Sequence, residues 1–134
     1  MRATCPMMAQ DYRTASRLIR KADGVLSDVH FPFSLINDVE SGQDYSEPTA
    51  CGITIALECQ AEKIPFVLCT DGWHHGNKAQ WVFETCKIAG WDIEEGNLSP
   101  EMVEDKDSNP YADTYLKPWI PALHVLLAKM QKEN

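Results

Sequence analysis

The stretch that decides the fold is Gly24-Val-Leu-Ser-Asp-Val-His-Phe-Pro32, in which a short apolar run ends at Asp28 and a proline follows four positions later. This pattern predicts a short buried strand over residues 24–28. A second apolar run, Ile64 to Thr70, is continuous, which is typical of a strand covered on both faces. Each predicted strand therefore ends in a polar side chain, Asp28 in the first and Thr70 in the second.

Helical periodicity surrounds the two predicted strands. Asp11 is the expected N-cap of a helix through about Lys21, and Pro48 suits the first turn of a second helix that runs to about residue 63. A third helix is predicted over residues 79–89, closed by Gly90, and a fourth begins near Trp119. A short strand is expected over residues 91–93, and residues 33–47 and 94–110 are predicted loops.

This alternation predicts a single α/β domain over residues 1–134, with three layers in which helices flank a mostly parallel sheet. Ligands in such folds sit beyond the carboxyl ends of the strands. The candidate site residues are therefore Asp28, Thr70 and Lys117, which precedes Pro118 and a terminal helix. A carboxylate, a hydroxyl and an ammonium group gathered at one sheet edge suit phosphoryl chemistry: the carboxylate attacks, the hydroxyl donates a hydrogen bond and the lysine offsets charge.

Charge and cysteine content indicate the class of partner and the cellular compartment to expect. The chain has 12 Lys and Arg against 20 Asp and Glu, a formal charge of −8. This disfavours nucleic acid and anionic membranes as partners, because both are negatively charged, and leaves a protein partner as the expectation. Five cysteines, an odd number without a CxxC spacing, fit a reducing cytoplasm. No apolar run approaches the length of a membrane span.

The strand-end residues resemble those of response-regulator receiver domains. Such domains carry an apolar strand ending in Asp-x-x-x-Pro, here Asp28 to Pro32, a strand ending in Thr or Ser, here Thr70, and a late Lys-Pro-aromatic step, here Lys117-Pro-Trp119. The resemblance implies a flavodoxin-like fold, with Asp28 as phosphoryl acceptor, Thr70 as switch hydroxyl and Lys117 as phosphate-binding lysine. It further implies Mg²⁺ at Asp28 and a kinase or output protein as partner. Receivers begin with a strand that ends in an acidic pair, which this sequence lacks, so an incomplete or rearranged sheet is expected.

Three other interpretations remain open. A degenerate pseudo-receiver would be a binding module without chemistry, so enzymatic activity is not the favoured expectation. The run Ile64 to Gly72 is also similar to the second motif of haloacid-dehalogenase-type phosphatases. A metal site is a third alternative, because His30, His74 and His75 could converge at the same edge. Absence of the first strand would also expose a sheet edge, which favours a homodimer formed by strand addition.

Overall fold

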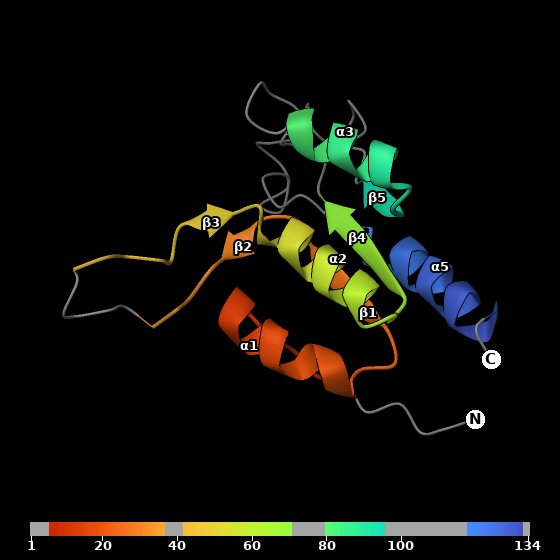
Figure 1. The fold of residues 1–134 in the computed structure, drawn as a ribbon, viewed down its shortest axis with the longest axis horizontal. Coiled ribbons are helices and arrows are strands. Elements are labelled where there is room, and N and C mark those ends of the chain that lie inside the picture. The colour runs from red at the N-terminus through yellow and green to blue at the C-terminus, as the bar shows by residue number, and fades with distance from the viewer. Residues whose placement is uncertain (1–5, 37–41, 71–79, 96–117, 133–134) are drawn as a thin grey trace, which may run out of the picture.

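The computed structural model describes residues 6–36, 42–70, 80–95 and 118–132, and it has the predicted α/β architecture (Figure 1). Within these residues, the main sheet has three parallel strands in the order β1 (Val25–Asp28), β4 (Phe66–Thr70) and β5 (Ile93–Glu95). The helices are α1 (Tyr12–Leu18), extended by a 3₁₀ turn at Ile19–Lys21, α2 (Cys51–Ala61), α3 (Gln80–Ala89) and α5 (Trp119–Lys132).

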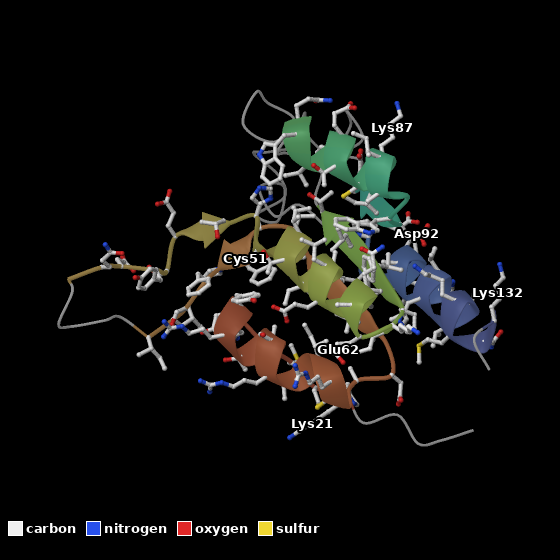
Figure 2. The ribbon with its side chains drawn as sticks, viewed as in Figure 1. Lys21, Cys51, Glu62, Lys87, Asp92 and Lys132 are labelled. Atoms are coloured by element: carbon white, nitrogen blue, oxygen red, sulfur yellow. The ribbon has the colours of Figure 1, made fainter. Side chains whose placement is uncertain are left out.

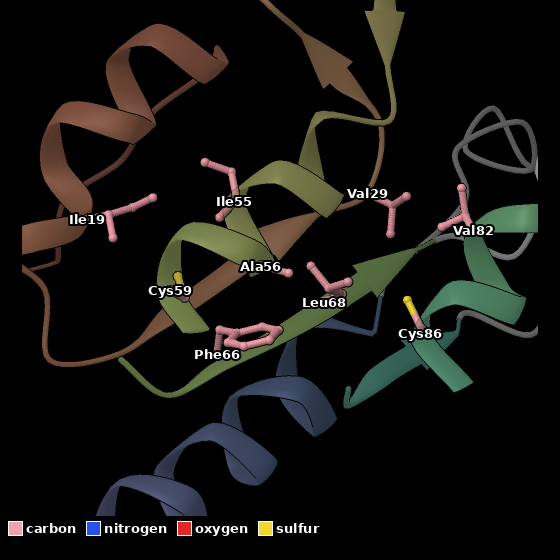
Figure 3. Close-up of a cluster of buried hydrophobic side chains, with 9 residues drawn as sticks. All are labelled: Ile19, Val29, Ile55, Ala56, Cys59, Phe66, Leu68, Val82 and Cys86. Atoms are coloured by element: carbon pink, nitrogen blue, oxygen red, sulfur yellow. The ribbon is translucent and has the colours of Figure 1, made fainter. Parts of the chain in front are cut away.

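The central strand β4 is buried on both faces, as its continuous apolar sequence predicted. Phe66 and Leu68 belong to a cluster of nine buried residues that joins the sheet to α2, α3 and the turn after α1 (Figure 3). The alternate residues Val67 and Cys69 pack instead against α5. The members of the larger cluster are Ile19, Val29, Ile55, Ala56, Cys59, Phe66, Leu68, Val82 and Cys86. Successive side chains of one strand thus hold helices to both faces of the sheet.

The N-terminal helix begins where its sequence predicted. Asp11 has extended backbone angles, and its carboxylate accepts a hydrogen bond from the Thr14 amide at 2.9 Å, which confirms it as the N-cap. Its second oxygen accepts from the Leu35 amide at 2.9 Å. One buried carboxylate therefore both begins α1 and ties it to the chain that follows β1.

The prediction that Pro48 lies in a helix was wrong. Pro48–Thr49 forms a short strand, β3, which pairs antiparallel with β2 (Phe31–Pro32), and α2 begins only at Cys51. The fixed backbone angle of proline suits an extended strand as well as a helical first turn. Pairing with Phe31–Pro32, far away in sequence, decides between the two.

Two helices end in the same hydrogen-bonded arrangement. After α3, the Gly90 amide donates a hydrogen bond to the Lys87 carbonyl, and the Trp91 amide donates one to the Cys86 carbonyl at 2.9 Å. Gly90 has a left-handed backbone with φ +71°, so it ends this helix as predicted. After α2, Lys63 takes the same left-handed position with φ +59°.

Strand boundaries differ slightly from those expected. β4 begins at Phe66, two residues after Ile64, because Pro65 contributes only its carbonyl, which accepts a hydrogen bond from the Val25 amide at 3.0 Å. β5 extends to Glu95 and so enters the segment 94–110 that was expected to be a loop. In the part of the chain that the structure describes, no helix is both long and apolar enough to cross a membrane.

Candidate functional site

The carboxyl ends of the three parallel strands form one edge of the sheet. Asp28 ends β1, Thr70 ends β4 and Glu95 ends β5. In the register of the sheet, Asp28 lies opposite Cys69 and Thr70 lies opposite Glu95. Asp28 is half-buried and Thr70 is only 2% exposed. The two residues predicted from the ends of apolar runs therefore lie on neighbouring strands, displaced by one residue.

Strand pleating decides how Asp28 and Thr70 can meet. Side chains alternate between the two faces of a strand, which places Asp28 on the same face as Leu26 and Thr70 on the same face as Leu68. Leu26 packs against the α5 cluster and Leu68 belongs to the α2 cluster, so the two faces are opposite. The carboxylate and the hydroxyl can therefore approach one another only beyond the strand ends, which is where ligands of parallel α/β sheets bind.

The first turn of α2 lies directly against the end of β1. The Gly52 amide donates a hydrogen bond to the Val29 carbonyl at 2.9 Å. A Cβ atom at Gly52 would lie 2.3 Å from the Asp28 carbonyl oxygen and 2.7 Å from the Val29 Cα, so only glycine permits this approach. The amino terminus of a helix carries a partial positive charge, and here it is held beside the Asp28 backbone.

Two further polar atoms lie at the beginning of α2. The Thr49 hydroxyl and the Cys51 thiol are 2.9 Å apart. Cys51, which is labelled in Figure 2, is the first residue of α2. Ala50, the N-cap, provides no side-chain hydrogen bond to the helix. Thr49, Cys51 and Gly52 were not predicted from the sequence, because the helix was expected to begin at Pro48. The sequence signal that could have indicated them is Thr49 followed by the small residues Cys51 and Gly52, where a strand leads into a helix.

The third predicted strand-end residue, Lys117, lies outside the described residues, as do His74 and His75. Strand β5 ends at Glu95, so among the described residues this edge carries the carboxylates of Asp28 and Glu95 and the hydroxyl of Thr70. His30 lies half-buried between β1 and β2. Within residues 6–36, 42–70, 80–95 and 118–132, no group of three or more His, Cys, Asp or Glu side chains could hold a metal ion.

A surface depression of about 520 Å³ lies at the opposite end of β4. One of its two lysines, Lys129, donates a hydrogen bond to the Phe66 carbonyl at 2.9 Å and pairs with the Asp92 carboxylate at 2.9 Å. These contacts fasten α5 to the amino end of the sheet, which gives Lys129 a structural role. The lining residues are Cys59, Gln60, Lys63, Ile64, Pro65, Phe66 and Lys129.

Comparison of the chain with protein-family models, with curated protein sequences and with solved structures found no match.

Proposed function

We propose that this protein is a stand-alone, receiver-like signalling domain of the flavodoxin-like class, which accepts a phosphoryl group on Asp28 and acts by binding a cytoplasmic protein partner. The observation that supports this most is the placement of Asp28 and Thr70 at the carboxyl ends of neighbouring parallel strands. Flavodoxin-like sheets have the strand order 2-1-3-4-5, in which the last three strands lie side by side in chain order. The order β1-β4-β5 agrees with those three strands.

The proposed reaction is a phosphoryl transfer from a phosphorylated partner kinase. A carboxylate oxygen of Asp28 attacks the phosphorus, a new O–P bond forms, and the bond to the donor group breaks, with the electron pair leaving on the donor. The transferred group brings roughly two negative charges near neutral pH. The positive end of α2, which approaches the Asp28 backbone through Gly52, would offset part of that charge.

Thr70 and Lys117 would bind the phosphoryl group once it is attached to Asp28. The Thr70 hydroxyl would donate a hydrogen bond to a phosphoryl oxygen beyond the strand ends, and the Lys117 ammonium would pair with the same group. Strand β1 leads within two residues into β2, and β2 pairs with β3 just before α2. New negative charge at Asp28 would therefore change the electrostatic environment of the junction between β3 and α2. A partner that contacts the junction would then distinguish the two states.

Mg²⁺ is a separate component of the proposal. It prefers carboxylate and carbonyl oxygens in octahedral geometry. Asp28 supplies one carboxylate, whereas Glu95 lies two strands away, about 10 Å at the usual strand spacing. The described residues therefore do not form a complete Mg²⁺ site, and no step of the transfer is assigned to the ion.

Thermal melting with beryllofluoride, a phosphoryl mimic, tests the acceptor role. We expect the mimic to raise the melting temperature of the wild type, because a ligand that binds only the native state stabilises it, by about 2.7 kcal/mol at a hundredfold excess over Kd. Asp28→Asn should not respond, whereas Asp23→Asn, an exposed aspartate before the amino end of β1, should respond like the wild type. Each protein is melted with and without Mg²⁺, so that dependence on the ion is measured separately.

A wild type that does not respond, or an Asp28→Asn variant that responds equally, would contradict phosphorylation of Asp28 and leave a binding module without chemistry. Steady release of phosphate from a small phosphate ester, lost in Asp28→Asn, would point instead to a phosphatase.

A further inference from the structure

Charge is distributed very unevenly along this chain. Residues 1–21 contain five of the twelve bases and a single acid, Asp11, whereas residues 22–134 contain seven bases and nineteen acids. Asp11 is 6% exposed, and hydrogen bonds from Thr14 and Leu35 occupy its carboxylate. Residues 1–21 are therefore strongly basic although the whole chain is acidic, and Asp11, the single acid among them, is buried.

The structure places the four described bases of this region, those on α1 and its 3₁₀ turn, on one surface. Tyr12, Ala15 and Ile19 turn toward the core. Exposed basic side chains occupy the outward positions of α1 and its 3₁₀ turn, and we call them the basic face: Arg13, Arg17, Arg20 and Lys21. The three arginines recur at intervals of four and three residues, so they lie along one side of the helix over about 11 Å. Figure 2 shows Lys21 at the edge of the molecule, away from Lys87 on α3 and Lys132 on α5.

Internal contacts orient the basic face without neutralising it. The Arg13 guanidinium lies over the Phe33 ring, 5.4 Å from its centre. The Arg20 Nε is 3.4 Å from a Glu62 carboxylate oxygen, but the Arg20 side chain is 80% exposed. An exposed pair of this kind contributes little energy and is readily exchanged for another carboxylate. Glu58, the other acid near α1 on α2, accepts hydrogen bonds from the Tyr12 and Ser16 hydroxyls.

We infer that the basic face binds an acidic segment of a partner protein. Guanidinium groups fit carboxylates in a two-pronged geometry, and three arginines in a row suit a segment with several Asp or Glu side chains. DNA or an anionic membrane would present a wide negative surface, which the formal charge of −8 on the whole chain disfavours. A narrow acidic segment could contact the roughly 11 Å length of the basic face without covering a wider area. This inference is independent of chemistry at Asp28.

The test is binding of a fluorescein-labelled twelve-residue peptide with six glutamates to the full chain, followed by fluorescence anisotropy. We expect binding at low salt that weakens as salt is raised. Arg17→Glu combined with Lys21→Glu should weaken binding about tenfold or more, because it removes the positive charge of the face. Lys87→Glu combined with Lys132→Glu changes the net charge equally at exposed sites elsewhere, and should change affinity less than about twofold.

Thermal melting of each variant checks folding, and Arg17→Gln with Lys21→Gln replaces the charge reversal if that variant unfolds. Three results would overturn the inference: no binding at low salt, equal weakening in both double variants, or tighter binding to duplex DNA or anionic vesicles than to the peptide. An Asp28→Asn variant should bind the peptide as the wild type does, so loss of the acceptor role and loss of this surface are distinguished.

Discussion

At the scale of single residues, the edge of the sheet depends on one position that has no functional group. Gly52 allows the first turn of α2 to reach the end of β1, where its amide bonds the Val29 carbonyl. The strand-end positions of Asp28 and Thr70 could be predicted because each residue ends an apolar run. Gly52 could not, since the close approach that requires it involves a strand more than twenty residues earlier in the chain.

Gly52→Ala should destabilise the protein by about 1–3 kcal/mol, the usual cost of forcing a methyl group into occupied space. The substitution gains helix propensity of about 1 kcal/mol, so the observed loss is net of that gain. Urea denaturation measures it. Thr54→Ala, at an exposed position of the same helix, is the matched control and should not destabilise the protein, because alanine favours the helix by a few tenths of a kcal/mol. Equal stability of Gly52→Ala and the wild type would show that the helix can move away from Asp28.

At the scale of elements, the sequence predicted correctly those helix ends that depend on interactions between neighbouring residues. The Asp11 cap and the Gly90 terminus were predicted correctly, because each depends on neighbours within a few residues. The start of α2 was not, because Pro48 joins a strand pair with Phe31–Pro32 that only the folded chain brings together. The extension of β5 to Glu95 likewise follows from its register with Thr70.

The Asp11 cap should make stability depend on acid. Hydrogen bonds from Thr14 and from the Leu35 amide hold the pKa of Asp11 below its ordinary value of 3.8. A lowered folded-state pKa stabilises the protein above the ordinary pKa, and that contribution is lost as the pH falls below about 4. Asp11→Ala should therefore cost about 1 kcal/mol at pH 7.

The difference between wild type and Asp11→Ala should shrink at pH 3, as measured by urea denaturation at both pH values. Asp11→Asn keeps a capping oxygen but does not titrate, so its acid-induced loss of stability should be smaller than that of the wild type. A wild-type advantage over Asp11→Ala that is the same at pH 7 and pH 3 would contradict this assignment.

At the scale of the whole molecule, one strand serves both cores. Phe66 and Leu68 of β4 contribute to the cluster under α2, and Val67 and Cys69 to the cluster under α5. The two layers of helices therefore share the same backbone, and damage to one side is expected to open the other. The continuous apolar sequence of β4 made this arrangement predictable, although which helix covers which face was not.

Buried thiols provide the readout of this coupling. Burial raises the pKa of Cys59 to about 11 and raises the pKa of Cys86, so both should resist a thiol reagent at pH 8 until the protein opens. Leu126→Ala, on the opposite face of the sheet, should cost about 2–5 kcal/mol and accelerate labelling of Cys59 by about tenfold or more. Leu127→Ala, at a position 41% exposed, should have a small effect.

Site-resolved mass spectrometry measures the labelling rates. Unchanged labelling of Cys59 in a clearly destabilised Leu126→Ala variant would mean that the two layers open separately.

The pairing of β2 with β3 determines how well the segment between these two strands can tolerate insertions. It closes the base of the segment between them, and the Ser34 amide adds a hydrogen bond to the Tyr45 carbonyl at 3.3 Å. Once the two ends of an excursion are fixed, its entropic cost grows only with the logarithm of its length, by about 0.6 kcal/mol for each doubling. Residues between Ser34 and Tyr45 are therefore a natural place for insertion of a foreign peptide or a reporter, because the sheet edge at Asp28 would be held by its own contacts.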